Sequence, residues 1–271
     1  MAKRIIMIGN YKGGSGKSQT ALELAYWLTL KQQRVLLIDL DHQANTTKVL
    51  SRDIPIDKRT LPDILIEGDV ITLNDISSRR IGIDNMQIDY IASGLAAGRL
   101  EKKLPDDTPK EYVLKDALED IQYSYDYILL DTPPSAELIS TCALIASDSI
   151  LITSQASFFS AEGVNEMMPV IKRVQKHPRM NPSLKVMGIL ITMYEETKDS
   201  RIVVSNLRKS YGRLLLTPYI RKCTKVKESN RYYTTVQSYA PNSTSAIDYK
   251  NAFNNLFGEE LHLYSPTYLI H

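Results

Sequence analysis

The sequence is poor in cysteine. Its 271 residues include only Cys142 and Cys223, and neither belongs to a CxxC pair or lies beside a histidine cluster. A structural zinc site needs four clustered ligands, and a disulfide scaffold needs more cysteines. We therefore expect neither, and two isolated thiols are typical of a protein from a reducing cytoplasm.

Long apolar runs are missing as well. No segment approaches the roughly 18 consecutive apolar residues of a membrane-spanning helix. Met1–Ile8 holds two basic residues followed by only four apolar ones. A secretory signal, in contrast, has an apolar core of about 7–15 residues. We expect no membrane span and no secretory leader.

A large net charge is also absent. The 33 Lys and Arg residues are nearly balanced by 31 Asp and Glu residues, which gives a formal net charge of +2. This total does not by itself indicate a nucleic-acid partner. The composition, 43% hydrophobic and 24% charged, is that of an ordinary globular protein.

What the sequence does have is an alternation of two kinds of segment. Short apolar runs, typical of strands buried on both faces of a sheet, lie at Arg4–Ile8, Val35–Ile38, Tyr127–Leu130, Ile150–Ile152, Val186–Ile191 and Leu214–Leu216. Helix-compatible segments lie at Lys17–Lys31, Lys110–Ile121, Ala136–Ala146, Ala161–Lys176 and Ser200–Tyr211. The alternation predicts an α/β fold with a mostly parallel twisted sheet flanked by helices. No linker divides the chain, so we expect one domain over residues 1–271, least regular at 51–110.

A glycine-rich loop follows the first apolar run. Residues 9–18 read GNYKGGSGKS, between an expected strand and an expected helix. Glycines let backbone N–H groups point at phosphate oxygens, and the helix N-terminus adds donors and a positive dipole end. Lys17 would meet the β- and γ-phosphates, and the Ser18 hydroxyl would bind Mg²⁺. The expected phosphate-binding residues are Lys12, Gly13, Gly14, Ser15, Gly16, Lys17, Ser18 and Gln19.

The loop departs from the ordinary pattern G-x-x-x-x-G-K-[ST]. Its first glycine is replaced by Tyr11, and a second lysine, Lys12, precedes the other glycines. The string K-G-G-x-G-K-[ST] resembles the deviant Walker A motif of the ParA/MinD family of P-loop ATPases. The resemblance implies that Lys12 reaches across a dimer to the partner's nucleotide. A second cation there would neutralise charge that develops during phosphoryl transfer.

The apolar run Val35–Ile38 ends in two aspartates, Asp39 and Asp41. Ligands of open α/β sheets bind beyond the carboxyl ends of the strands. The segment resembles the D-x-D-P-Q-G-N string of the same family, with His42 and Ala44 in place of Pro and Gly. The resemblance implies that Asp41 orients or activates the attacking water and that Asp39 lies near the Mg²⁺ shell or the switch region.

A third apolar run, Tyr127–Leu130, ends in Asp131 and is similar to a Walker B strand. By that resemblance Asp131 holds Mg²⁺ together with Ser18 and Asp39. Residues 150–163 and 191–194 also resemble family segments, whereas the match is loose from Lys222 onward. The expected catalytic residues are Lys12, Lys17 and Asp41.

The balanced total charge hides a basic segment. Residues 198–231 hold ten basic and two acidic residues, a local charge of +8, so the rest of the chain carries −6. Such a segment can neutralise several phosphates. It contains no groove-reading motif, which predicts sequence-independent contacts with the DNA backbone. The alternative is a solvated helical face. The DNA-binding candidates are Arg213, Arg221, Lys222, Lys225, Lys227 and Arg231.

The family resemblance implies a ParA-like function. The protein would bind ATP and Mg²⁺, form a nucleotide sandwich homodimer and bind double-stranded DNA nonspecifically. With a ParB-like centromere-binding partner it would segregate plasmid or chromosomal DNA. It would be cytoplasmic and nucleoid-associated, with no membrane partner. Nucleotide binding would favour the dimer and hydrolysis would release it.

Three other functions are considered. A MinD-like membrane-cycling ATPase has a basic amphipathic C-terminal helix, but residues 259–271 contain Pro266 and no Lys or Arg. A reductase of the nitrogenase iron-protein type needs paired cysteines to bridge its cluster, and Cys223 lies far along the chain from Cys142. A metabolic kinase or synthetase could use the same loop, but the sequence offers no motif for an acceptor substrate.

Overall fold

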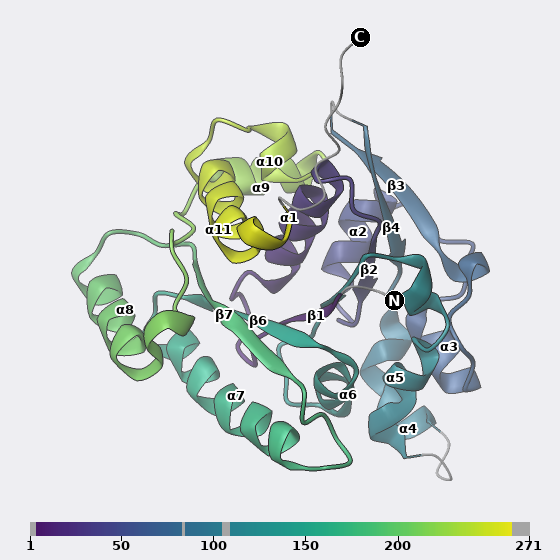
Figure 1. Ribbon diagram of the computed structural model, residues 1–271. Coiled ribbons are helices and arrows are strands. Elements are labelled where there is room, and N and C mark those ends of the chain that lie inside the picture. Colours follow the sequence, from purple (N-terminus) through teal and green to yellow (C-terminus); the bar gives the residue numbers. More distant parts are fainter. Residues whose placement is uncertain (1–3, 83–84, 105–108, 262–271) are drawn as a thin grey trace.

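The computed structural model describes residues 4–82, 85–104 and 109–261 (Figure 1). A seven-stranded sheet crosses the molecule in the order β3-β4-β2-β5-β1-β6-β7. Its strands are β1 Arg4–Gly9, β2 Val35–Asp39, β3 Ser77–Ile81, β4 Met86–Ile91, β5 Tyr127–Asp131, β6 Ser149–Gln155 and β7 Lys185–Thr192. The β3–β4 pair is antiparallel and the other pairs are parallel. The predicted α/β class with a mostly parallel sheet is confirmed.

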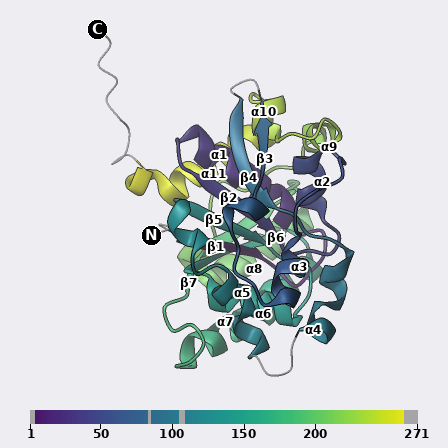
Figure 2. The same ribbon diagram turned by 90° about the vertical axis from the view of Figure 1, so that its right-hand side faces the viewer.

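Helices cover both faces of this sheet (Figures 1 and 2). One face packs against α1 Lys17–Leu30, α2 Asn45–Ser51, α9 Thr224–Arg231, α10 Val236–Tyr239 and α11 Thr244–Leu261. The other face packs against α3 Leu61–Glu67, α4 Leu100–Lys103, α5 Val113–Ala117, α6 Leu138–Ala146, α7 Phe158–Lys176 and α8 Lys198–Tyr211. Every residue of β2 and β5 is buried, as expected for strands enclosed between two helical layers.

Burial of apolar side chains on the two faces creates two cores. Trp27 of α1 packs against Phe253 and Phe257 of α11, with ring centroids 5.9 and 5.5 Å apart. On the opposite face, Met167 and Ile171 of α7 are buried with the β6 and β7 side chains. The central strands are thereby clamped, and their carboxyl ends are held at one edge of the sheet.

Two sequence predictions about local structure were wrong, and one pair of strands was missed. Leu214–Leu216 is not a strand; the chain makes a short 3₁₀ turn at Gly212–Leu214 and a single bridge between Ile189 and Leu215. Pro218 follows closely, and its missing N–H cannot extend a ladder. The helix expected over residues 110–121 is α-helical only in α5. The irregular middle contains the β3–β4 hairpin, which the sequence analysis missed.

No helix within the described ranges is long and apolar enough to cross a membrane. The C-terminal segment that the sequence analysis judged a poor membrane anchor falls mostly at residues 262–271, outside the described residues.

Candidate functional site

The glycine-rich loop joins the buried end of β1 to α1, which begins at Lys17. Gly14 and Gly16 have φ values of +72° and +83°, a region that side-chain-bearing residues rarely adopt. A Cβ on Gly16 would also lie 3.2 Å from Thr192 Oγ1. Both glycines are therefore required by the path of the backbone, which turns sharply into the helix N-terminus.

Side chains at the ends of neighbouring strands form hydrogen bonds that fix the glycine-rich loop. Thr192 Oγ1 donates to Ser15 O at 2.8 Å, and the Ser15 and Thr153 hydroxyls lie 3.1 Å apart. Asn10 Nδ2 donates to Thr153 O at 2.6 Å. Gln155 Nε2 donates to the carbonyl of Gly14. The contacts of Gln155 and Thr192 hold the carbonyls of Gly14 and Ser15, and a loop fixed in this way can offer its N–H groups to phosphate.

Lys17 is a buried cation at the centre of the site. Its residue is 6% exposed, and its Nζ donates to Lys12 O at 3.2 Å. Burial lowers the pKa of Lys17, while the carboxylates of Asp131 and Asp41 oppose that shift. An anionic phosphate would add a further negative charge beside the Lys17 ammonium and would stabilise its charged form. Lys17 is therefore suited to bind an anion.

Lys12 is held within its own subunit. Its Nζ lies 3.2 Å from Glu166 Oε1 of α7, and its N–H donates to Asn10 Oδ1 at 2.9 Å. The same helix presses directly on the loop at Gly163, where a Cβ would fall 2.1 Å from Asn10 Oδ1 and 2.6 Å from Lys12 Cγ. Gly163 is thus needed for α7 to approach the loop this closely.

Asp131 ends β5 between the loop and α2. Its Oδ2 accepts a hydrogen bond from Thr46 Oγ1 at 2.5 Å, while its buried Oδ1 has no hydrogen-bond partner in the described part of the chain. Burial raises the pKa of Asp131, although the hydroxyls of Thr46 and Ser18 and the Lys17 ammonium oppose the rise. A buried carboxylate oxygen without a partner, close to the Ser18 hydroxyl, fits the oxygen ligands that Mg²⁺ prefers.

Asp39 lies directly across from Asp131 in the β2–β5 register. Its Oδ2 accepts from the Thr47 N–H at 2.8 Å and the Thr47 hydroxyl at 2.7 Å, and its Oδ1 accepts from the Asp41 N–H at 3.0 Å. Burial and the neighbouring Asp131 raise the pKa of Asp39. Both of its oxygens are thus used inside the loop between β2 and α2, where they hold Asp41 and the start of α2 in place.

Asp41 is 5% exposed and stands at the open end of that loop. Its Oδ1 accepts from the Gln43 N–H at 3.0 Å and lies 3.5 Å from His42 Nδ1. Ala44 caps α2 with a φ of +51°, a left-handed conformation that favours glycine. The backbone geometry therefore explains why glycine would suit position 44, and the alanine does not displace the carboxylates.

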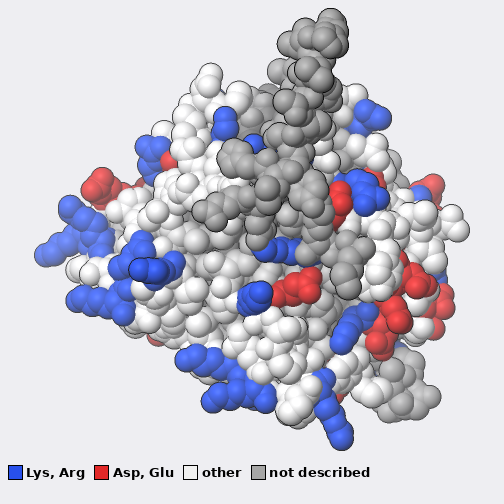
Figure 3. Space-filling model, viewed as in Figure 1, with Lys and Arg blue, Asp and Glu red and all other residues white. Residues whose placement is uncertain are grey.

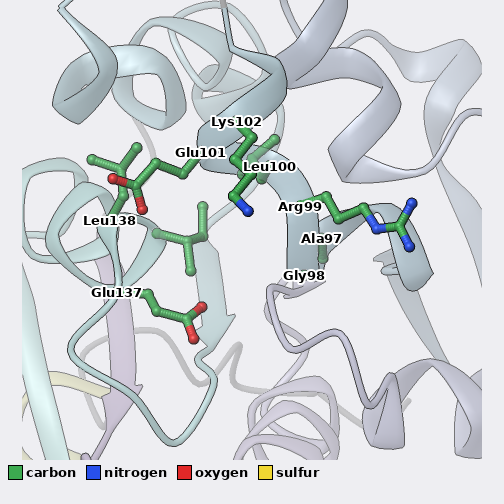
Figure 4. A pocket seen from close by; sticks show the side chains of 9 residues that line it. Ala97, Gly98, Arg99, Leu100, Glu101, Lys102, Glu137 and Leu138 are labelled. Atoms are coloured by element: carbon green, nitrogen blue, oxygen red, sulfur yellow. The ribbon is translucent and has the colours of Figure 1, made fainter.

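A hollow of about 460 Å³ lies beyond this loop, between α4 and the start of α6. A Cβ on its lining residue Gly98 would come 3.8 Å from His42. Figure 4 shows Glu101, Lys102 and Glu137 around the hollow, with Arg99 extending away from them. Its lining carries charges of both signs.

Gln19 and the buried Glu23 of α1 connect the loop to α9 and α10. Gln19 Nε2 donates to Glu23 Oε1 at 2.7 Å, and Gln19 Oε1 accepts from Asn230 Nδ2 at 2.9 Å. Sequence reasoning named Gln19 only as a phosphate-binding residue. It missed Glu23, Asn230 and Thr46, whose importance depends on long-range contacts that no local motif signals.

The basic segment spreads over α8, the following turn and α9. All six DNA-binding candidates are exposed, but three are engaged in ion pairs, those of Arg221 with Asp248, Lys222 with Glu195 and Lys225 with Glu228. Arg213, Lys227 and Arg231 form no ion pair among the residues that the structure describes. On the face shown in Figure 3, basic side chains gather at the left and lower left, over α8 and α7.

The family described as an AAA domain matches residues 3–186 of the chain. The sporulation initiation inhibitor protein Soj of Bacillus subtilis is 32% identical over 248 residues, which cover 91% of this chain and 95% of Soj. The chromosome partitioning protein ParA of Caulobacter vibrioides is 31% identical and covers 87% of each chain. The similarity therefore extends well beyond the phosphate loop.

A solved structure shares the arrangement of the elements. Cobyrinic acid a,c-diamide synthase from Mycobacterium smegmatis, with a bound ATP analogue and magnesium, has a TM-score of 0.77 and 26% identity. The match covers 99% of this chain and all of that one. Proteins of this fold thus have different activities. The function of this chain has to be inferred from its site residues and from its relatives in sequence.

Proposed function

The chain belongs to the ParA/MinD family of P-loop ATPases, and from this premise we propose that it is a partition-type ATPase that binds and hydrolyses Mg·ATP. One observation supports the proposal above the others. Lys17 at the start of α1, Asp131 at the end of β5 and Asp41 just after β2 lie close together beside the glycine-rich loop. The carboxylates of Asp131 and Asp41 are near enough to oppose the fall in the Lys17 pKa that burial causes, and we assign Lys17 to the β- and γ-phosphates.

The triphosphate would lie in the cradle formed by residues 12–19, with Lys17 as its principal counter-charge. Ser18 and the unpartnered Oδ1 of Asp131 would hold Mg²⁺, with Asp39 behind them as the residue that orients the loop. Bound Mg²⁺ would neutralise charge on the transferring phosphoryl group.

Asp41 is the residue we assign to the attacking water. Its Oδ1 is occupied by the Gln43 N–H, whereas its Oδ2 takes no hydrogen bond from the described residues. An oxygen left free in this way can accept a hydrogen bond from water and orient that water toward the γ-phosphate. The role would be positioning in addition to proton acceptance, as is usual in phosphoryl transfer.

Lys12 supports the dimeric half of the proposal. In the single chain it pairs with Glu166, and its side chain is one-third exposed. Because this contact is a partly exposed ion pair, it is weak, worth about 0–1 kcal/mol. Lys12 can leave it at low cost to reach the nucleotide of a second copy.

The basic segment would give the ATP-bound dimer its affinity for duplex DNA, through phosphate contacts alone. A ParB-like centromere-binding protein would stimulate hydrolysis, and the protein would work in the cytoplasm on the nucleoid. The free cations Arg213, Lys227 and Arg231 are better placed for phosphates than the paired Arg221, Lys222 and Lys225.

The test is ATP hydrolysis and DNA binding measured on the same protein. We expect Mg²⁺-dependent turnover, and ATP-dependent, salt-sensitive binding of random duplex DNA. Asp41→Ala should keep ATP binding and lower hydrolysis by about 10²–10⁴-fold, while the exposed Asp57→Ala serves as control. Normal hydrolysis by Asp41→Ala would refute the assigned role. ATP-dependent binding to anionic liposomes instead of DNA would point to the MinD-like alternative.

A further inference from the structure

The hydrogen bonds around Gln19 join the phosphate loop to the helix that carries basic residues. Gln19 follows Ser18 directly in the first turn of α1. Its amide is shared between two partners, because Nε2 donates to Glu23 Oε1 at 2.7 Å and Oε1 accepts from Asn230 Nδ2 at 2.9 Å. Asn230 lies in α9 beside Lys227 and Arg231. A single side chain therefore spans from the nucleotide site to the basic segment.

Glu23 anchors this connection in the interior. It is fully buried, and its carboxylate accepts from the Val236 N–H at 2.6 Å, the Gln237 N–H at 3.2 Å and Gln237 Nε2 at 3.0 Å. Gln237 Nε2 also donates to the Glu23 carbonyl at 2.9 Å. A buried carboxylate is costly unless hydrogen bonds satisfy it. Here they tie the start of α10, and through it α9, to the middle of α1.

Helix α9 has a second attachment to an element of the nucleotide site. Tyr233, just after α9, donates from its hydroxyl to Asp53 Oδ2 at 2.6 Å, and Asp53 follows α2. The position of α9 thus depends on α1 and on α2, the two helices that begin at the phosphate loop and at the Asp41 loop. Phosphates that bind at the N-terminus of α1 would contact Ser18 and Gln19, which lie in the first turn of that helix.

We infer that the Gln19–Glu23–Asn230 network couples the nucleotide state of the phosphate loop to the position of α9, and so sets the affinity of the basic segment for duplex DNA. The inference depends on the proposed function, because it supposes that ATP and DNA bind to the same protein. Coupling between two sites is reciprocal: if ATP tightens DNA binding, DNA tightens ATP binding by the same factor. Asn230 acts as a positioning residue and touches neither ligand.

The experiment measures the DNA dissociation constant with and without ATP, and the ATP dissociation constant with and without DNA. In the unaltered protein we expect both ratios to agree and to lie in the range of about 5–150. Asn230→Ala should bring both toward one and leave ATP affinity without DNA unchanged. Because it removes no charge, it should not change the salt dependence of DNA binding. The exposed Asn206→Ala on α8 is the matched control.

The outcomes separate the two proposals. If the unaltered protein binds both ligands with ratios of one, ATP-dependent DNA binding and the coupling both fail. If it shows a large ratio that Asn230→Ala preserves, the coupling through Asn230 fails and the proposed function stands. A changed salt dependence in Asn230→Ala would also overturn the inference, since it would mean that the contacts of α9 with DNA are altered directly.

Discussion

Two groups of basic residues in this molecule differ in how they are held. Lys17 is buried at the start of α1, beside a loop fixed by hydrogen bonds to the ends of β6 and β7. The lysines and arginines of residues 198–231 are mostly exposed and lie on several elements, and three of the six DNA-binding candidates form ion pairs. A buried, fixed cation recognises one anion in one geometry. Exposed cations act together, with each contributing little and with strong dependence on salt.

Among the basic residues, the buried Lys17 should show the largest effect on ATP binding when it is substituted. Lys17→Ala should abolish measurable ATP binding, a loss of at least about 100-fold, because charge-assisted bonds in a desolvated site are strong. Titration calorimetry with ATP and Mg²⁺ measures it, and Lys227→Ala, an exposed lysine, is the control. Equal ATP affinity in Lys17→Ala and Lys227→Ala would contradict the idea that the buried lysine binds ATP and the exposed one does not.

Lys12 is intermediate between the two groups in solvent exposure, since its side chain is one-third exposed. Substitutions of Lys12 and of its partner Glu166 can therefore be compared. Lys12→Ala should keep ATP binding within a few-fold but lower hydrolysis by about 10–100-fold, since it removes a cation that acts in the transition state. Glu166→Gln frees the same lysine and should promote ATP-dependent dimerisation, measured by light scattering. Weaker dimerisation in Glu166→Gln would mean that this glutamate acts across the interface instead of retaining Lys12 within its subunit.

Within the exposed group, free and paired cations should behave differently. Lys227→Ala should weaken DNA binding equally for all sequences and reduce the slope of log affinity against log salt by about 0.9. Arg221→Ala removes the two side-chain hydrogen bonds of Arg221 to the buried Asp248; it should lower the midpoint of thermal unfolding more than it changes that slope. Slopes that change equally in both variants would show that the ion pair opens on DNA.

The smallest effect should be a pH dependence at Glu23. Burial raises the pKa of Glu23 above its ordinary value of 4.5. A carboxyl group with a raised native pKa contributes its full stability below pH 4.5 and loses it as the pH rises through the native value. The unfolding temperature of the unaltered protein, relative to Glu23→Gln, should therefore fall as the pH rises above 4.5. A difference that is constant with pH would contradict the shift.

The sequence predicted the order of strand, glycine-rich loop and helix well because its signal is local. The glycine spacing, Lys17 and Ser18 lie within a few residues, and the positive φ values at Gly14 and Gly16 explain that spacing. The apolar strands were found for a similar reason, since burial on both faces leaves an uninterrupted run. The polar edge strand β3, with four of its five residues exposed or partly exposed to solvent, has no such run and was missed.

Long-range geometry could not be predicted in the same way. Counting charges located the basic segment but could not show that Arg221 pairs with Asp248, 27 residues away. Asp39 was expected near the metal, and only the folded loop reveals its bonds to Thr47 and Asp41. The role of Gln19 depends on Asn230, 211 residues further along the chain.

The borders of the sheet have a consequence for how copies of this protein can assemble. On one border, β3 carries Arg79 and Arg80, charges that discourage an added strand. On the other, the outer side of β7 is partly occupied by bridging residues at Leu215. Association by extending the sheet from molecule to molecule, the route to fibrous aggregates, is thus obstructed at both borders. The proposed dimer would then form through loops and helices, whose contacts a bound nucleotide can change.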